Sequence, residues 1–359
     1  MASTGYLHYI AITTAASQEG SSDSSNFPVC VNTGSSGGCS PLNIASYLAV
    51  SGSGGYVQNT VTQTGGNGGT EPADAVFGTG PTCSTLLPWE TETYTTTTGV
   101  WIAWVQLPTL HHNTQDTFYL CFDRASMTTQ QNTGSYAPSA VWNSHFTSIY
   151  HLNGVHDSTA NGYTLSTQGT APAQTPSGQI GGAYSFSGAG SFYNLSQQYA
   201  PASSFTFSLW LNTANWNVSQ AFVQQGTDAV NGWNTSLNEA SGCSRPQIQT
   251  VFGTAVTIGT CNPFTNSSWH MITVTYVSAS GLTTIYADGA YSNSASAINS
   301  GRGAPAGTYF GYGGDVAGYF TGLMDEIEIS QVALTPDWVT AEYNNQNPSS
   351  TFLTAGSLH

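Results

Sequence analysis

Residues 318–343 read GYFTGLMDEIEISQVALTPDWVTAEY, and this stretch decides the class of fold. Its first half alternates between two sets of side chains, Leu323, Asp325, Ile327 and Ile329 against Met324, Glu326, Glu328 and Ser330. Alternation with a period of two is typical of a half-buried strand, with one face in a core and the other in solvent. We therefore expect a strand here, with Glu326 and Glu328 on its solvent face.

A short helix is predicted directly after this strand. Thr335 can cap free backbone N–H groups, Pro336 suits the first helical position, and Asp337 suits the positive end of the helix dipole. The helix should run for two to three turns. Its buried side should hold Trp338, Val339 and Tyr343. We expect no other regular helix of comparable length.

The rest of the composition favours strands. Forty glycines and 12% aromatic residues are typical of many short strands joined by tight turns. Residues that favour helices are scarce, which argues against a helical bundle and against an alternating α/β fold. A length of 359 residues suggests about two domains. The sequence therefore predicts an all-β protein made of two β-sandwich domains, with one short helix near the C-terminus.

The charge balance excludes two classes of partner. Only 6% of the residues are charged, and eighteen acids face three arginines with no lysine. Nucleic-acid backbones and anionic membranes are held by clustered lysine and arginine, so neither partner is expected. No apolar run approaches the roughly 20 residues of a membrane-spanning helix. The absence of lysine also excludes Schiff-base chemistry.

Six cysteines indicate disulfides, because their number is even and no metal-site spacing such as C-x2-C occurs among them. Cys30 and Cys39 flank a glycine-rich turn, and Cys243 and Cys261 are also close in sequence. Elimination then pairs Cys83 with Cys121, although six cysteines allow fifteen connectivities.

Disulfides require an oxidising location, but residues 1–20 lack a secretory signal. Two origins reconcile these observations: a secreted product that has lost its leader, or a viral particle protein that is oxidised after release. Met1 followed at once by a predicted strand favours the second. We expect an extracellular or virion-surface location.

Residues 127–139, MTTQQNTGSYAPS, show no periodicity and are predicted to be a linker. The linker separates a β-rich base domain, residues 1–126, from a second domain, residues 140–347. Residues 348–359 are then expected to form a tail.

Five segments in the second half carry a resemblance to a known family: HLNGVHDSTANGYTL, IGGAYSFSGAGSFYNL, FTFSLWLNT, WHMITVTYVSASGLTTIYADG and GLMDEIEISQVALTPDWVTAEY. In this order they resemble the laminin-G-like branch of the concanavalin A-like lectin/glucanase jelly rolls, over residues 141–345. The first 125 residues resemble a β-rich domain of unknown function that is common in microbial surface and phage-encoded proteins. The resemblance implies a two-sheet jelly roll that binds glycans, other proteins or calcium without chemistry.

The acidic strand also raises the question of catalysis. Glu326 and Glu328 would lie ~6–7 Å apart on one strand face, a separation that suits the two carboxyls of a glycosidase. The glucanases of this superfamily, however, carry three carboxylates on one face in a Glu-x-Asp-x-Glu run, whereas Asp325 is predicted to face the other way. We interpret the glutamates as a solvated face and Asp325, which matches a recurrent acid of the family, as a group that caps backbone N–H.

Two loops carry candidate calcium ligands, since hard cations prefer carboxylate, amide and carbonyl oxygens in turns. Asp157 and Asn161 lie in HDSTANG, and Asp315 lies in YGGDVAG. The alternative for each loop is an Asx turn without a metal. His111 and His112 are adjacent and so point to opposite faces of any strand, which favours structural roles over a zinc site.

Aromatic residues in polar loops are the candidate glycan ligands, because a ring stacks on a sugar's apolar face while nearby amides bind its hydroxyls. Trp216 and Trp233 fit this pattern, and Tyr312 and Tyr319 near Asp315 form a second set. The alternative is that these rings fill the edges of the core.

These observations predict a non-enzymatic adhesion or recognition protein. It would bind glycans or neighbouring protein subunits, and it would be displayed on a phage or viral particle as part of an oligomer or assembly. A purely structural particle or filament subunit is the second hypothesis. A glycoside hydrolase is the third, and it is disfavoured by the split carboxylates.

Overall fold

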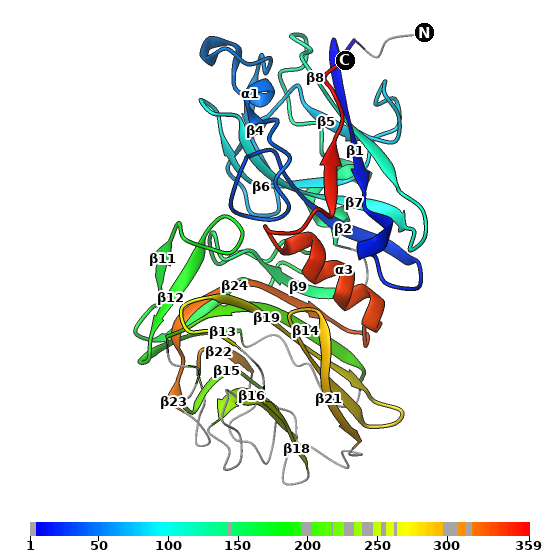
Figure 1. The fold of residues 1–359 in the computed structure, drawn as a ribbon. Coiled ribbons are helices and arrows are strands. Elements are labelled where there is room, and N and C mark those ends of the chain that lie inside the picture. Colours follow the sequence, from blue (N-terminus) through cyan, green and yellow to red (C-terminus); the bar gives the residue numbers. More distant parts are fainter. Residues whose placement is uncertain are drawn as a thin grey trace. The chain divides into compact units, whose positions relative to one another are not determined.

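The computed structural model describes residues 5–142, 145–194, 203–214, 216, 218–225, 233–238, 247–252, 256–261, 264–296, 307–312 and 318–359. The chain divides into two compact units (Figure 1). Unit 1 comprises residues 1–144, 158–160 and 340–359, and unit 2 comprises residues 145–157 and 161–339. Both units are built mainly of strands, so the predicted all-β class is confirmed.

Unit 1 contains three small sheets. The four-stranded sheet has the order β25-β1-β8-β5, with bounds Leu353–Ala355, His8–Thr14, Thr117–Phe122 and Val76–Gly78. The three-stranded sheet has the order β2-β7-β6, with bounds Ser24–Asn32, Val100–Leu110 and Trp89–Thr95. The strands β3 (Thr60–Thr62) and β4 (Thr70–Pro72) form a pair. The short helices are α1 (Ala45–Leu48), α2 (Pro138–Val141), η1 (Ala16–Gln18), η2 (Ser51–Ser53) and η3 (Gly134–Tyr136).

The end of the chain is a strand of unit 1, so the predicted tail at residues 348–359 is wrong. Leu353 and Ala355 pair with Thr14 and Ile12, which places β25 beside β1 (Figure 1). Three residues are too few for periodicity to show in the sequence. The predicted linker, residues 127–139, likewise belongs to unit 1 and includes η3.

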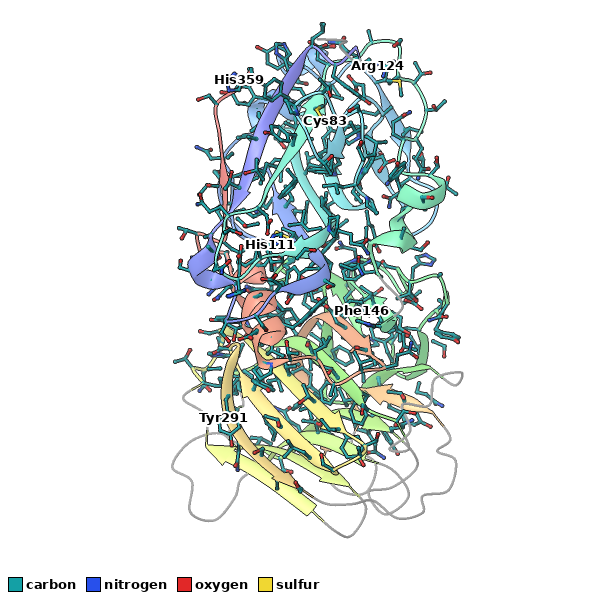
Figure 2. The ribbon with its side chains drawn as sticks, turned by 90° about the vertical axis from the view of Figure 1, so that its right-hand side faces the viewer. Cys83, His111, Arg124, Phe146, Tyr291 and His359 are labelled. Atoms are coloured by element: carbon teal, nitrogen blue, oxygen red, sulfur yellow. A yellow bond between two sulfur atoms is a disulfide. The ribbon has the colours of Figure 1, made fainter. Side chains whose placement is uncertain are left out.

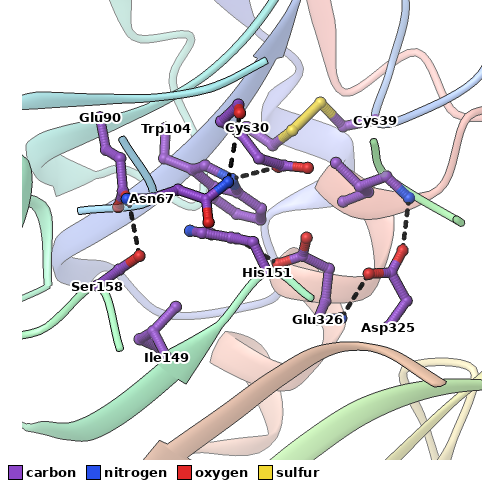
Figure 3. Close-up of polar contacts among 12 residues, drawn as sticks. Cys30, Cys39, Asn67, Glu90, Trp104, Ile149, His151, Ser158, Asp325 and Glu326 are labelled. Carbon is purple, nitrogen blue, oxygen red and sulfur yellow. Dashed lines mark hydrogen bonds and ion pairs between the residues drawn. A yellow bond between two sulfur atoms is a disulfide. The ribbon is translucent and has the colours of Figure 1, made fainter. Parts of the chain in front are cut away.

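Strand β7 is the middle strand of the three-stranded sheet. Trp101, Ala103, Trp104 and Val105 are almost completely buried along it, and such a near-continuous apolar run is typical of a strand that is covered on both faces. Two disulfides lie in unit 1, Cys83–Cys121 (Figure 2) and Cys30–Cys39 (Figure 3), and both pairings are confirmed. The third predicted pairing stays a prediction, because Cys243 lies outside the described residues.

Unit 2 is a sandwich of two sheets. The sheet that we call the β24 sheet has the order β11-β12-β24-β14-β19-β20-β21, with β9 beside β24. The sheet that we call the β15 sheet has the order β10-β13-β22-β15-β16-β17-β18, with β23 beside β15. The bounds in the first are β9 Phe146–Tyr150, β11 Ala173–Thr175, β12 Ala183–Ser187, β14 Phe205–Asn212, β19 Trp269–Val277, β20 Leu282–Ala287, β21 Ala290–Ser296 and β24 Thr321–Ser330. Those in the second are β10 Ser166–Gly169, β13 Gly190–Asn194, β15 Gln220–Gln225, β16 Trp233–Asn238, β17 Gln247–Phe252, β18 Val256–Cys261, β22 Thr308–Phe310 and β23 Gly318–Tyr319.

The hydrophobic core of unit 2 lies between these two sheets. The β24 sheet contributes Phe207, Leu209 and Ile272, and the β15 sheet contributes Phe192 and Phe310. Burial of aromatic and aliphatic side chains from facing sheets is what holds a β-sandwich together. The jelly-roll prediction for the second half of the chain is confirmed.

Strand β24 departs from the predicted alternation at Glu326. This residue has φ +46°, and the register slips so that Ser208 pairs with Glu328 but Trp210 pairs with Asp325. An extra residue in one strand is a β-bulge, which reverses the inward and outward positions beyond it. The core therefore takes Met324 before the bulge and Ile327 after it.

The predicted solvent face of β24 is also wrong. Glu326 is 1% exposed and Glu328 is 4% exposed. Periodicity in one strand cannot reveal the bulge, because the bulge is defined by the pairing with β14.

The predicted helix is confirmed as α3, Pro336–Gln346, and it is the longest helix among the described residues. Its start follows the expected chemistry, since the backbone N–H of Trp338 donates to Thr335 Oγ1 at 3.2 Å. Trp338 and Val339 are buried and Tyr343 is half-buried. Within the described part of the chain, no helix combines the length and hydrophobicity needed to cross a membrane.

Candidate functional site

A pocket of about 220 Å³ opens on the β15 sheet of unit 2. We call it the tyrosine pocket. Its lining residues are Gln168 and Gly169 from β10, Ser191 from β13, Tyr309 from β22, Tyr312 after β22, and Tyr319 from β23. Strands β22 and β23 both pair with β15, at Val223–Gln225 and at Gln220–Ala221, so they lie end to end along it.

Strand alternation explains which side chains reach this pocket. Phe192 and Phe310 are direct partners across β13 and β22 and point into the core. Their neighbours Ser191 and Tyr309 must therefore point to the opposite face of the sheet. Gln168 on β10 lies directly opposite Ser191, which brings its amide to the same face.

The three tyrosine rings stand at angles to one another. The centroids of Tyr309 and Tyr312 are 5.1 Å apart with an interplanar angle of 45°, and those of Tyr312 and Tyr319 are 5.3 Å apart at 63°. Gly311 makes this arrangement possible. It has φ +81°, and a Cβ there would lie 2.4 Å from the Phe186 ring, so a residue with a side chain cannot replace it without strain.

Ser191 gives the pocket a polar group that lacks an internal partner. The residue is 1% exposed, and its Oγ has no hydrogen-bond partner among the described residues. A buried polar atom without a partner costs about 1–3 kcal/mol, so a ligand hydroxyl at this position would recover free energy. The pocket thus combines aromatic faces, an amide and an unsatisfied hydroxyl.

The structure brings together only part of the predicted ligand set. Tyr312 and Tyr319 meet in the pocket as a pair, as the sequence prediction placed them. Tyr309 was missed, although its alternation with Phe310 in TYFGY could have indicated it. Gln168 and Ser191 were also missed, and no sequence signal points to them, because only the pairing of β10 with β13 places them in the pocket.

The two tryptophans predicted to bind glycans lie elsewhere. Trp216 is completely buried, its Nε1–H donates to the Thr265 carbonyl oxygen at 3.1 Å, and its ring lies 4.7 Å from that of Phe264. It is a core residue, so its prediction as a ligand platform is wrong. Trp233 begins β16, but its side chain lies outside the described residues.

The acids of β24 hold the fold together rather than line the pocket. Asp325 accepts hydrogen bonds from the backbone N–H groups of Ile180 and Glu326, both at 2.9 Å, which confirms its predicted capping role. Glu326 Oε2 lies 2.7 Å from His151 Nδ1, and both side chains are fully buried (Figure 3). The predicted contrast between Asp325 in the core and two solvated glutamates does not hold.

Comparison with known proteins identifies the fold of unit 2. A family model described as the concanavalin A-like lectin/glucanases superfamily matches residues 187–340. Unit 2 carries a concanavalin A-like domain. No curated protein matches the chain.

Among solved structures, the chain is similar to domain 4 of AbnA, a GH43 extracellular arabinanase from Geobacillus stearothermophilus, in complex with arabinotriose. The identity is 20%, the match covers 54% of this chain and 96% of that one, and the TM-score is 0.46. It is also similar to the receptor binding domain of botulinum neurotoxin mosaic serotype C/D (10% identity, 56% and 51% covered, TM-score 0.45). The binding domain of Paraclostridial Mosquitocidal Protein 1 matches with 19% identity, 56% and 51% covered and a TM-score of 0.42. The chain spans about half the length of these toxin binding domains.

Unit 2 also contains the residues predicted to bind calcium. Asp157 accepts backbone N–H groups with both carboxylate oxygens, from Ile149 at 3.0 Å and from Tyr163 at 2.9 Å. The Asn161 amide donates to the Thr147 carbonyl oxygen at 3.0 Å. These contacts hold the loop in shape by themselves. Asp315 lies outside the described residues, and calcium binding stays a prediction.

A carboxyl with a strongly perturbed pKa belongs to unit 1. Glu71 is 1% exposed, and its Oε2 accepts hydrogen bonds from Thr91 Oγ1 at 2.9 Å and Asn132 Nδ2 at 3.2 Å. Burial raises the pKa of Glu71 to about 7, and the hydrogen bonds from Thr91 and Asn132 lower it only in part.

This shift predicts that the stability of unit 1 falls as the pH rises from about 4.5 to about 7. In that window Glu71 keeps its proton in the folded protein but loses it in the unfolded chain. A rise in pH therefore favours the unfolded chain. The full effect is about 3 kcal/mol, since each pKa unit is worth ~1.4 kcal/mol.

Denaturant unfolding followed at several pH values checks this expectation. The Glu71→Gln side chain cannot ionise, so the unfolding free energy of the variant should fall less steeply between pH 5 and 7 than that of wild type. At pH 8 the variant should be the more stable protein. Equal slopes in the two proteins would show that Glu71 is ionised in the folded state.

Proposed function

We propose that this protein is a non-enzymatic recognition protein that binds carbohydrate in the tyrosine pocket of its concanavalin A-like domain. One observation carries the proposal: three tyrosine rings and the unpartnered Ser191 hydroxyl line the same pocket. Aromatic faces stack on the apolar faces of sugar rings, while amides and hydroxyls bind sugar hydroxyls. The membership of residues 187–340 in a lectin/glucanase superfamily is consistent with such a ligand.

The positions of the acids support a role without catalysis. Glycosidases place two carboxyls on either side of the scissile bond. The described lining of the tyrosine pocket contains no carboxylate. Asp325 and Glu326, the nearest acids to Tyr319 in sequence among the described residues, are buried: Asp325 accepts backbone N–H groups, and Glu326 contacts His151.

The proposal includes an extracellular location, where the ligand would be a surface glycan or a glycosylated protein. The disulfides Cys30–Cys39 and Cys83–Cys121 support it, because such bonds persist in oxidising environments. It also includes display on a phage or viral particle as part of an assembly. Sedimentation of the native protein with particles would support display, and recovery as a free monomer would contradict it.

Replacing Tyr312 with alanine should weaken carbohydrate binding at least about tenfold. The Tyr312 ring contacts both other tyrosine rings, so its loss removes one stacking face and releases its two neighbours. A glycan array identifies the ligand for wild type, and calorimetry then compares the proteins.

The matched control for this variant is Tyr291→Ala. Tyr291 is 64% exposed on β21 in the same domain and does not line the pocket, so binding should be unchanged. Equal affinity of Tyr312→Ala and wild type would overturn the tyrosine pocket as the binding site.

A further inference from the structure

The size of the tyrosine pocket limits what it can hold, and this inference rests on the function proposed above. Pockets for drug-sized ligands measure about 300–1,000 Å³. The tyrosine pocket, at about 220 Å³, is smaller. It therefore has room for one sugar ring with its hydroxyls rather than for several linked units.

The walls of the pocket are arranged for one ring as well. A row of coplanar aromatic rings would provide a flat platform along which a chain of sugars could lie. Tyr309, Tyr312 and Tyr319 instead meet at 45° and 63°, so they do not form such a platform. Tyr309 pairs with Tyr193, which lies two residues along β13 from Ser191. Tyr309 and Ser191 are therefore diagonal neighbours on one face of the sheet, about 7–8 Å apart.

The described side chains of the lining suit a neutral ligand. They are a glutamine, a serine and three tyrosines, and none carries a charge at neutral pH. A charged sugar would lose hydration without gaining an ion pair from these residues. Ser191 Oγ, buried and unpartnered, supplies one directed hydrogen bond for a hydroxyl.

We infer that the tyrosine pocket binds the single terminal unit of a neutral glycan, with one sugar hydroxyl hydrogen-bonded to Ser191 Oγ. The pocket holds this unit, and the remainder of the glycan extends into solvent. Affinity should therefore depend on the identity of the last unit and little on chain length.

The test starts from the glycan that binds best on an array and uses calorimetry on the full chain. Three probes are compared: the methyl glycoside of the terminal unit, the corresponding trisaccharide, and the trisaccharide extended by one further sugar on its terminal unit. The methyl glycoside should bind within about threefold of the trisaccharide. The extended glycan should lose at least about tenfold, and so should a trisaccharide whose terminal unit is oxidised to a uronic acid.

A double-mutant cycle tests the role of Ser191. Ser191→Ala should weaken binding of the methyl glycoside about three- to tenfold, the range for one neutral hydrogen bond. The second arm of the cycle uses deoxy analogues of the methyl glycoside, each of which lacks one hydroxyl. The analogue that lacks the hydroxyl bonded to Ser191 should bind wild type and Ser191→Ala equally well. Thermal unfolding of Ser191→Ala confirms that the variant is folded, and serine to alanine removes no large side chain from the core.

The outcomes separate this inference from the function on which it rests. Tyr312-dependent binding whose affinity rises with each added sugar unit would overturn the single-unit pocket but leave carbohydrate recognition in place. A preference for the uronic acid would overturn the neutral ligand. If no carbohydrate of any length or charge binds, the proposed function itself is wrong.

Discussion

Unit 2 is expected to lose about 3–5 kcal/mol of unfolding free energy when Trp216 is replaced by alanine, the range for a buried tryptophan. The side chain is completely buried, and its ring packs against Phe264 and His270. Its Nε1–H bond to the Thr265 carbonyl oxygen is lost as well, but Thr265 is exposed, so water can replace this donor. The loss of packing contacts dominates, because the cavity cannot collapse completely.

Hydrogen exchange of peptides from β14 and β19 measures this loss in unit 2 alone, since a protein of two units need not unfold in one step. Trp216→Phe is the matched control. It keeps an aromatic ring in the core and removes the hydrogen bond, so it should cost about 1–2 kcal/mol. A stable Trp216→Ala protein that no longer binds carbohydrate would instead restore Trp216 as a ligand platform.

Removal of the Cys83–Cys121 disulfide is expected to cost unit 1 about 4 kcal/mol, by the entropy of closing a loop between cysteines 38 residues apart. The bond joins the loop after β5 to β8, two adjacent strands of the four-stranded sheet. In the unfolded chain the bond restricts a long segment. Its loss therefore stabilises the unfolded state more than it disturbs the sheet.

The double variant Cys30→Ser/Cys39→Ser is the comparison, because its cysteines are only 9 residues apart. The same entropy argument gives about 2.5 kcal/mol for that bond. Hydrogen exchange in β1 and β8 should show a larger loss of unfolding free energy for Cys83→Ser/Cys121→Ser than for Cys30→Ser/Cys39→Ser. The reverse order would show that local packing around Cys30 outweighs the effect on the unfolded chain.

Several features could be predicted because neighbouring residues determine them. The Thr335-Pro336-Asp337 start of α3 depends on caps and dihedrals within one turn. The pairing of Cys30 with Cys39 followed from closeness in sequence, and that of Cys83 with Cys121 from elimination. The all-β class followed from composition, because glycine-rich turns and aromatic strands are needed throughout such a fold.

The candidate site could be predicted only in part. Tyr312 and Tyr319 lie seven positions apart in the chain, so their common loop region was visible in the sequence. Ser191 and Gln168 come from strands whose pairing brings them beside these rings, and nothing in their own neighbourhoods signals it. Trp216 had the polar sequence surroundings of a ligand platform, yet contacts with distant Phe264 and Thr265 bury it.

By itself, the sequence determined the all-β class, the strand and helix at residues 321–346, and the two disulfides of unit 1. Only the tertiary structure decided the bulge at Glu326, the strand at Leu353–Ala355 and the membership of the tyrosine pocket. The physical reason is that propensity, capping and alternation act between residues a few positions apart. Register, burial and pocket formation depend instead on contacts between strands that are far apart in the chain.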